Sequence, residues 1–448
     1  MTYPFDVNLE LDGIEKSLRL TSTHSFNDKR FSTGLLTVDL ILNGGIVPGA
    51  WYTFFGPEQS AKSTLAMTVL AALSKTSVPI VALVDFEGSY QPDYFFNICQ
   101  QQGIKNPKAL FGIPHAKGKG YIEQPRIRYY SMGIGDHFFD FLAKLERQLP
   151  DKLKEGDSYW YVFDNTKENR KKLGDTKYDK ALYSKTGRLY VPAEDAAPQA
   201  IIIVDSYPAM MPEAMDVDDP SEAMAVQARM FSKNLPRVKG KMKNKMITVI
   251  GINQLRLNPG ARFGDPHYEP GGEALKFMSD ARIKCSPRAN PYASGPFETE
   301  ASVLNDNEDV YRYVVHQAIK NKLGTPQLEN WARLWINDGA GNAWGFDPVY
   351  DVFQFLTCAG FITGTRKKMV LSCPFWKISD LSLKWEQLKL WVLGDKEHVT
   401  ELCKKLGVKP FPMRKACAQL MEEHRETIFE NWFKGQAEED EEEEEEEE

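Results

Sequence analysis

Two kinds of hydrophobic pattern alternate along most of this sequence. Short apolar runs bounded by turn residues are typical of buried strands, and longer stretches with an apolar residue every three or four positions are typical of helices. Their alternation predicts an α/β fold on a mostly parallel sheet flanked by helices, because strands covered on both faces are apolar throughout. Strands are expected at 51–55, 80–84, 200–204, 246–252, 281–285, 311–319 and 332–336, and helices at 64–75 and 222–243.

The pattern changes at both ends of the chain and once within it. Residues 1–31 lack a clear period and are expected to form an N-terminal segment, either attached to the body or extended as an oligomerisation arm. Residues 113–195 are rich in Lys, Gly, Tyr and Asp and are predicted to be an insertion into the body, which spans 32–340. Residues 341–437 are expected to form a small, mainly helical domain. Within the insertion, a helix is expected around 135–150 and a long basic loop at 167–188. Near the C-terminus, helices are expected at 349–359, 383–393, 397–406 and 413–433.

The formal net charge of −7 conceals two regions of opposite sign. Residues 438–448 are all acidic and carry eleven negative charges, so the rest of the chain has a net charge of +4. A tail of this kind cannot bury apolar surface and is expected to be disordered. The protein is therefore a mildly basic body that carries an acidic tail.

Cysteine usage and hydrophobicity exclude several classes of protein. The six cysteines are scattered without a C-x-x-C pair, so neither a zinc site nor a disulfide framework is expected. No apolar run approaches the roughly 20 residues that span a bilayer, and the first residues lack a signal-peptide pattern. A cytoplasmic protein without membrane contact is expected.

The clearest chemistry lies between the strand at 51–55 and the helix at 64–75. A tight loop in this position directs its backbone N–H groups and the helix dipole at one point, which favours a phosphate. Lys62 would neutralise the β- and γ-phosphates, and the Ser63 hydroxyl would bind Mg²⁺. Ala61 departs from the usual G-x-x-x-x-G-K-[ST] pattern, and the alternative is a turn with an incidental lysine. The loop consists of Gly56, Pro57, Glu58, Gln59, Ser60, Ala61, Lys62, Ser63 and Thr64.

Three polar residues follow other predicted strands. Because parallel strands end at one edge of a sheet, Glu87, Asp205 and Gln254 are expected to lie near the loop. Asp205 would hold Mg²⁺ through water, and Glu87 would take a proton from the attacking water. Gln254 would sense the γ-phosphate and pass the signal to the Gly/Pro-rich residues that follow. The alternative for each is a solvated strand end or a helix cap.

Basic residues indicate a second ligand, DNA. Single-stranded DNA is bound by neutralising phosphates and stacking rings on bases. The loop after Gln254 interleaves bases and aromatic residues, and the helix before it carries a basic cluster, for which a solvated face is the alternative. The acidic tail either competes with DNA for the basic groove or serves as a solubility tail. The loop residues are Arg256, Arg262, Phe263, His267 and Tyr268, and the cluster residues are Lys233, Arg237, Lys239, Lys241, Lys243 and Lys245.

Nine segments match a known family in its own order. They are Ser32-Thr33-Gly34 with Asp39, Gly56–Thr64, Asp85-Phe86-Glu87, Ile203-Val204-Asp205-Ser206, Ala228-Arg229-Met230, Ile252–Arg256, Phe263–Pro266, Gly271–Phe277 and Lys320-Asn321-Lys322. The sequence thereby resembles the RecA recombinases, including the phage UvsX-type members. The resemblance covers about residues 32–340 and extends weakly into 349–373.

This resemblance implies a RecA-type P-loop ATPase core that uses ATP and Mg²⁺. It further implies a DNA-dependent ATPase that forms a helical filament on single-stranded DNA and exchanges its strand with homologous double-stranded DNA, with single-strand-binding and mediator proteins as further partners. Carried over by position, Lys62, Ser63 and Asp205 hold phosphate and Mg²⁺, Glu87 is the catalytic base, Tyr94 stacks on adenine, Gln254 relays the state of ATP to DNA, and Lys320 and Lys322 reach the ATP of the next protomer.

The family's two DNA-binding loops correspond to 208–221 and 255–271 here. Pro259 stands where the second loop usually carries an aliphatic wedge. Ala61 replaces a glycine as in phage members, which suggests a phage origin, and the expected location is the cytoplasm of a bacterial cell or of a phage-infected host cell. A ring helicase and an ATP-gated DNA-coating protein with little turnover are the alternatives. DNA contacts are expected from Arg229, Lys233, Arg256, Pro259, Arg262, Phe263, Gly271 and Gly272.

Overall fold

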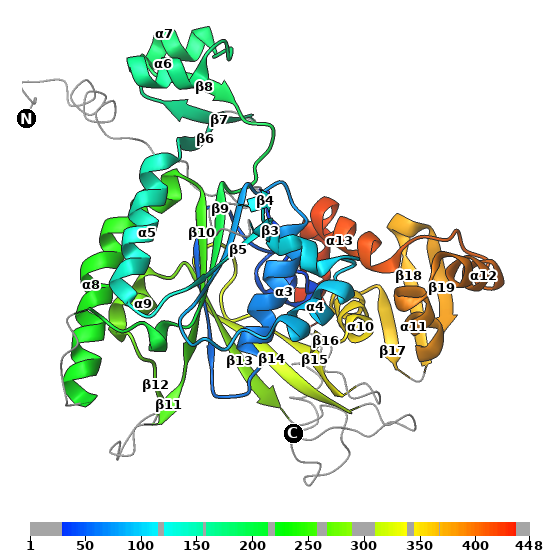
Figure 1. Cartoon of the computed structure of the whole chain (residues 1–448). Helices are drawn as coiled ribbons and strands as arrows, with labels where there is room; N and C mark the ends of the chain where they lie inside the picture. Colours follow the sequence, from blue (N-terminus) through cyan, green and yellow to red (C-terminus); the bar gives the residue numbers. More distant parts are fainter. Residues whose placement is uncertain are drawn as a thin grey trace, which may run out of the picture.

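The structure is a computed structural model that describes residues 29–114, 121–155, 158–213, 220–257, 267–288, 310–337, 345–366 and 368–435. Within these residues, nine strands form one twisted central sheet (Figure 1). The six strands from β13 to β5 are parallel, and β14, β15 and β16 continue the sheet in antiparallel pairs. The strand order is β16 (Gly345–Phe346), β15 (Glu329–Asn337), β14 (Val310–Asn321), β13 (Ala281–Arg288), β1 (Trp51–Gly56), β10 (Ile247–Gln254), β9 (Ala200–Asp205), β2 (Ile80–Asp85) and β5 (Ile127–Ser131).

The central strands are buried on both faces, which confirms the predicted α/β fold class. Along β9, Ile201 and Ile203 point into one hydrophobic cluster, while Ile202 and Val204 point into the other. This alternation follows from the two-residue period of a strand. The first cluster includes α2 (Leu36–Ile41), α3 (Lys62–Ser74) and α4 (Pro92–Gln101), and the second includes α5 (Gly135–Gln148), α8 (Pro220–Asn244) and α9 (Gly272–Met278).

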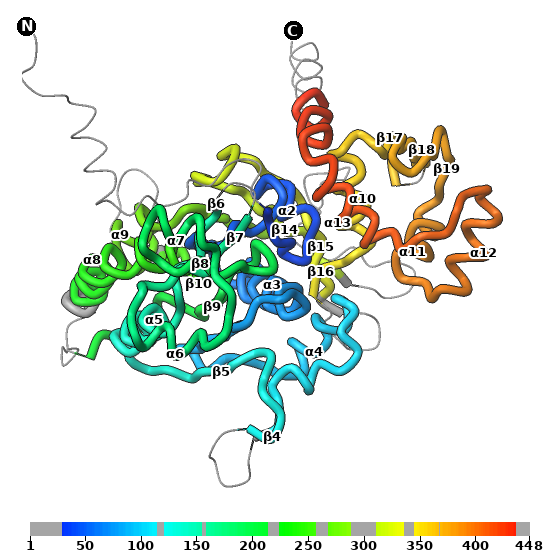
Figure 2. Tube along the Cα trace, turned by 90° about the horizontal axis from the view of Figure 1, so that it is seen from above, coloured from blue at the N-terminus to red at the C-terminus, as the bar shows by residue number. Residues whose placement is uncertain are grey.

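The predicted insertion is smaller in the structure than 113–195. Strand β5 pairs in parallel with β2 at the edge of the sheet, and α5 packs on α8 through Phe139 and Phe231, whose ring centroids are 6.0 Å apart. Both elements therefore belong to the core. A turn η1 (Pro107–Phe111) and a hairpin of β3 (Ile113–Pro114) and β4 (Tyr121–Glu123) precede them, and the hairpin projects from the body (Figure 2).

A separate lobe follows α5 and projects beyond the sheet at the top of Figure 1. Its antiparallel sheet consists of β6 (Asp151–Glu155), β7 (Ser158–Phe163) and β8 (Leu189–Pro192). The prediction of a long basic loop at 167–188 is wrong, because these residues form α6 (Lys167–Leu173) and α7 (Lys180–Thr186). Neither helix buries a residue. Helices without a buried face need no periodic apolar positions, so the hydrophobic pattern did not reveal them. Both begin at a side-chain cap, in which Thr166 accepts a hydrogen bond from the Asn169 N–H and Asp179 from the Leu182 N–H.

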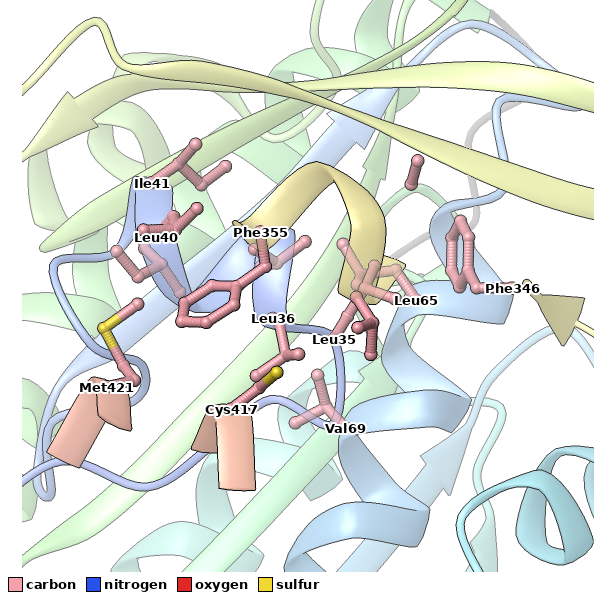
Figure 3. Packing of buried hydrophobic residues seen from close by; sticks show 14 of the residues in the cluster. Leu35, Leu36, Leu40, Ile41, Leu65, Val69, Phe346, Phe355, Cys417 and Met421 are labelled. Atoms are coloured by element: carbon pink, nitrogen blue, oxygen red, sulfur yellow. The ribbon is translucent and has the colours of Figure 1, made fainter. Parts of the chain in front are cut away.

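The C-terminal part contains the expected helices and a small sheet that was not predicted. The sheet of β17 (Ile362–Thr365), β18 (Lys368–Cys373) and β19 (Ile378–Leu383) precedes α11 (Trp385–Leu393) and α12 (Lys396–Leu406), and η3 (Pro374–Trp376) lies within it. Helices α10 (Pro348–Cys358) and α13 (Met413–Glu423) instead pack on the core. In Figure 3, Phe355 of α10 and Cys417 and Met421 of α13 surround Leu36 and Leu40 of α2. Residues 425–435 are also helical.

Several predictions fall on parts of the chain that the structure does not describe. Residues 1–28 of the N-terminal segment and the acidic tail at 438–448 lie outside the described residues. The same holds for 214–219 in the first predicted DNA loop and 258–266 in the second. None of the described helices combines the length and apolar character needed to cross a membrane.

Candidate active site

The predicted phosphate loop leaves β1 at the middle of the sheet and leads into α3. A Cβ on Gly56 would lie 2.1 Å from the Cys285 carbonyl oxygen, so only glycine fits between β1 and β13 at this point. Within the loop, the Ser60 hydroxyl donates to the Pro57 carbonyl at 2.8 Å, and the Lys62 ammonium donates to the same oxygen at 2.5 Å. Burial lowers the pKa of Lys62. The loop is therefore a compact turn with its lysine folded over it.

Two loop residues other than glycine have left-handed backbone conformations. Gln59 has a φ of 57° and Ala61 a φ of 62°. This region is unfavourable for residues with a Cβ. An arginine far along the chain holds the loop in this shape, because Arg312 of β14 donates from Nη1 to the Gln59 carbonyl at 2.8 Å. Arg312 is a part of the site that sequence reasoning missed.

Replacing Ala61 by Gly is expected to stabilise the protein, since glycine adopts the same φ without the Cβ penalty. The gain should be about 0.5–1 kcal/mol after allowing for the greater entropy of glycine in the unfolded chain. Thermal unfolding without nucleotide checks this as a rise in Tm. Ala66→Gly, in the interior of α3, is the matched control and should lower the Tm. A lower Tm for both variants would contradict the strain at Ala61.

Asp85 organises the turn that carries Glu87. Its Oδ1 accepts hydrogen bonds from the N–H groups of Glu87 and Gly88 at 3.0 and 2.8 Å, and its Oδ2 accepts from the Tyr90 N–H and the Tyr129 hydroxyl. The carboxylate thus satisfies the backbone of a tight turn at the end of β2. The consequence is that Glu87 is held in a fixed position at the carboxyl edge of the sheet.

The structure brings Glu87 together with residues from two other strand ends. The Ser206 hydroxyl, directly after β9, donates to Glu87 Oε1, and the Gln254 side-chain amide, at the end of β10, donates to the same oxygen at 3.4 Å. The expected proximity of Glu87 and Gln254 is therefore present. Ser206 was quoted only as part of a motif, and its bond to Glu87 was not expected.

Asp205 lies beside the start of α3. Asp205 pairs with Asp85 in the register of β9 and β2, and its carboxylate accepts a hydrogen bond from Ser63. Burial, followed by repulsion from Glu87, raises the pKa of Asp205 to about 6. A buried carboxylate next to other carboxylates is a site that favours a cation.

The donor set fits Mg²⁺ held together with a nucleotide. No group of three or more His, Cys, Asp or Glu side chains in the described ranges is arranged to hold a metal by itself. The Ser63 hydroxyl and the Asp205 carboxylate are oxygen donors, and Mg²⁺ in phosphate sites commonly takes one or two protein oxygens with phosphate and water as its other ligands. A metal at this place would therefore depend on bound phosphate.

Replacing Asp205 by Asn is expected to stabilise the free protein at pH 7.5 by on the order of 2 kcal/mol. The folded pKa of about 6 exceeds the unfolded value of 3.8, so the stability from the protonated form is full below pH 4 and is lost as pH rises through 6. Asparagine does not ionise, so the Asp205→Asn variant does not lose this stability as the pH rises. The Tm difference between variant and wild type, measured without Mg²⁺ and nucleotide, should shrink from pH 7.5 to pH 5. A difference that grows towards pH 5 would contradict this reasoning.

A cavity of about 90 Å³ lies next to the loop, between α3 and α4. Tyr94 lines it, and its hydroxyl hydrogen-bonds to Thr64 Oγ1 at 2.8 Å. Gln91 and Met67 also line it, as do Ser63 and Asp205, which carry the candidate oxygen donors for Mg²⁺. A flat base entering here would meet the Tyr94 side chain while its phosphates reach the loop.

Lys320 and Lys322 lie away from this loop. Ala281 of β13 pairs with Tyr52 at the start of β1 and with Asn321 on β14, whereas the loop begins at Gly56. Four residues of strand separate the two places by roughly 13 Å. Lys320 donates to the carbonyls of Lys276 and Phe277, and burial, with repulsion from Lys322, lowers the pKa of Lys320 to about 8. In its own chain, this lysine pair lies level with the amino end of β1, whereas the phosphate loop leaves the carboxyl end of the same strand.

The basic cluster on α8 is partly used inside the protein. Lys239, Lys241 and Lys245 form ion pairs with Asp280, Glu146 and Asp151 at 2.7, 3.6 and 3.0 Å. Lys239 and Lys245 are largely covered and attach the end of α8 to neighbouring segments, so the solvated-face alternative is wrong for these two, whereas the Lys241 side chain is 64% exposed. DNA binding by the cluster stays a prediction. The pairing was invisible in the sequence because all three acids are distant along the chain.

The other expected DNA contacts have different outcomes. Arg229 and Lys233 are exposed on α8, and Arg256 is exposed on β11 (Arg256–Leu257), which pairs with β12 (His267–Tyr268) as the stem of the second loop. Gly271 and Gly272 begin α9 and lie against α8, where a Cβ on Gly272 would be 2.9 Å from the Ala228 Cβ. Their positive φ and this contact give them a packing role. Pro259, Arg262 and Phe263 lie outside the described residues.

The fold and the site together define an α/β P-loop nucleotide-binding protein. Residues 194–334 match the family model of the RecA N-terminal domain. The chain is 25% identical over 329 residues to protein RecA of Mycoplasma mobile, covering 73% of this chain and 74% of that protein. It is 27% identical over 332 residues to protein RecA of Thermus aquaticus, covering 74% and 72%.

The crystal structure of the RadB recombinase is similar over 70% of this chain and 98% of that chain, with 16% identity and a TM-score of 0.39. Together, the family model and the two RecA proteins support the resemblance to RecA-family recombinases that the motifs indicated. The phage UvsX-type branch stays a prediction.

Proposed function

We propose that this protein is an ATP-dependent DNA strand-exchange recombinase that forms a helical filament on single-stranded DNA. The observation that carries the proposal is the contact of Glu87 with Ser206 and Gln254, which joins three strand ends beside a phosphate loop. The similarity to RecA proteins over about three quarters of the chain supports the same function.

In this proposal, Lys62 and the loop N–H groups bind the phosphates, and Ser63 and Asp205 hold Mg²⁺. Bound ATP with Mg²⁺ supplies the phosphoanhydride bond that is hydrolysed. Glu87 accepts the proton of the attacking water, since its carboxylate is fixed by two donors and its remaining oxygen sites stay available. Tyr94 contacts the base from the adjoining cavity.

Gln254 connects hydrolysis to DNA. It ends β10, donates to Glu87, and is followed after one residue by the β11–β12 stem of the second loop. A change in charge at Glu87 or at the γ-phosphate would move this side chain and the stem together. The proposal assigns single-stranded DNA to this loop, with Arg256 as a phosphate contact.

The next protomer completes the site in this proposal. Lys320 and Lys322 are too far from their own loop, and in this proposal they exchange their hydrogen bonds to the Lys276 and Phe277 carbonyls for the ATP of a neighbouring molecule. An interfacial clamp of this kind makes filament geometry depend on ATP. We further propose a UvsX-type phage protein that acts in the bacterial cytoplasm with single-strand-binding and mediator proteins.

Electron microscopy with single-stranded DNA and a non-hydrolysable ATP analogue tests the assembly. Helical filaments are expected, and closed rings that unwind forked DNA would establish the helicase alternative. Steady-state ATPase assays test the enzyme. Hydrolysis should rise on addition of single-stranded DNA, whereas DNA coating without hydrolysis would favour an ATP-gated coating protein.

A further inference from the structure

The lobe formed by residues 151–192 consists of a partly buried sheet and an exposed helical cap. The cap, residues 164–188, comprises α6, α7 and their connection. It lies beyond the amino ends of the parallel strands, because the lobe sheet leads directly into the start of β9. The β11–β12 stem lies beyond the carboxyl ends, at the other end of the molecule (Figure 1). The cap is therefore remote from the site described above.

The cap has a strong excess of positive charge. Residues 164–188 contain eight basic and four acidic residues. Three of the acids are engaged locally: Asp164 pairs with Arg188 at 3.3 Å, Glu168 pairs with Lys172 at 2.9 Å, and Asp179 caps α7. Among the described residues, the following exposed cations have no carboxylate partner: Lys167, Arg170, Lys171, Lys177, Lys180 and Lys185.

Arg170 donates from Nε to Asn165 Oδ1 at 2.6 Å within the cap, whereas the other five cations make no side-chain contact that holds the described part of the lobe together. The lobe is attached by other contacts, in which Asp151 pairs with Arg188 and Lys245, and Lys152 donates to the Ala197 carbonyl. Neither α6 nor α7 buries a residue. Lys167, Arg170 and Lys171 occupy positions i, i+3 and i+4 of α6 and so share one face. Like charges on one helix face are mutually repulsive, so an external anion would relieve them.

The chemistry of the cap favours the backbone of a duplex over unpaired bases. Single-strand binding relies on rings that stack on bases. The rings of Tyr178 and Tyr183 instead pack on each other, with centroids 5.3 Å apart. Duplex DNA presents one charge per about 1.7 Å of its axis, the densest regular array of phosphates that a cluster of cations can meet.

We propose that the cap at 164–188 is a binding site for the phosphate backbone of double-stranded DNA, separate from the two DNA loops. The proposal rests on the proposed function for its purpose, since strand exchange acts on a duplex as well as a single strand. Binding itself can be measured without any exchange. Lys167, Arg170 and Lys171 form its centre.

The test compares the K167A/R170A/K171A variant of the full-length protein with wild type by fluorescence anisotropy. The probe is a labelled 30-base-pair duplex, titrated at several salt concentrations. Loss of three phosphate contacts should weaken binding by about ten-fold or more at low salt and reduce the slope of log K against log salt by about 2 to 3. The affinity for an oligothymidine single strand should change less than two-fold.

The control variant is K105A/K108A/K144A, which removes the same charge from three exposed lysines outside the cap. It should bind the duplex as wild type does, and circular dichroism should show both variants folded. Unchanged duplex binding by the cap variant overturns the proposal and would favour an acidic protein as the partner of the cap. An equal loss for both probes overturns the assignment to duplex DNA. Failure of the proposed function would instead appear as absent ATP hydrolysis in wild type.

Discussion

Glu87→Gln is expected to lower DNA-stimulated ATP hydrolysis by about 10²–10⁴-fold, the usual contribution of a general base. Glutamine keeps the size of the side chain and can still accept hydrogen bonds from Ser206, but it cannot take a proton from water. ATP binding should persist, because Lys62 and the loop backbone are unchanged. Steady-state phosphate release measures hydrolysis, and binding of a fluorescent ATP analogue measures affinity.

Glu123→Gln is the matched control for this substitution, since Glu123 is exposed on β4 and belongs to no part of the site. It should hydrolyse ATP at the wild-type rate. If Glu87→Gln also retained the wild-type rate, Glu87 would not be the base, and the coating-protein alternative would gain support. Loss of both binding and hydrolysis would indicate a disrupted turn instead, given that the Glu87 N–H is held by Asp85.

A mixture of two inactive variants is expected to recover part of the ATPase activity. A K62A protomer lacks the phosphate lysine but retains Lys320 and Lys322, and a K320A/K322A protomer has the reverse defect. If neighbouring protomers share a site, a mixture contains interfaces at which K320A/K322A supplies the intact loop and K62A supplies the lysine pair. Each variant alone should lose at least about 10²-fold in hydrolysis, because each removes charge stabilisation from the same transition state.

The measurement is ATPase activity on single-stranded DNA as a function of mixing ratio. A maximum near equal amounts is predicted, at up to about a quarter of wild-type activity if protomers assemble at random along a filament. The control mixture combines K62A with Glu87→Gln, whose defects lie in the same half of the site, and it should stay inactive. A linear dependence on mixing ratio, without a maximum, would show that the lysines act within their own chain.

The sequence predicted the framework of the fold because its central strands are continuously apolar. The strands β1, β2, β9 and β10 were expected within two residues of their observed ends, and the parallel arrangement placed Glu87 and Gln254 at one edge. Strand β5 was missed since it has five residues and is half-exposed at the edge of the sheet. It was therefore assigned to an insertion.

The remaining features depend on contacts between distant residues. Arg312 reaches Gln59 across 253 positions, and no local pattern marks this hydrogen bond. The ion pairs of the basic cluster on α8 could not be predicted for the same reason. The charges of the cluster suggested DNA, but three of its lysines pair with Asp151, Glu146 and Asp280. The left-handed conformation of Ala61, with a φ of 62°, belongs to the folded loop and is not marked by any local sequence pattern.

Joint-molecule formation tests the central claim most directly. A labelled single strand is incubated with the protein, ATP and Mg²⁺, followed by a supercoiled duplex, and the deproteinised products are separated on a gel. A strand homologous to the duplex should become joined to it, a heterologous strand should not, and K62A should form no product. If wild-type protein binds DNA and hydrolyses ATP but gives no homology-dependent product over a range of Mg²⁺ and salt concentrations, it is not a strand-exchange recombinase.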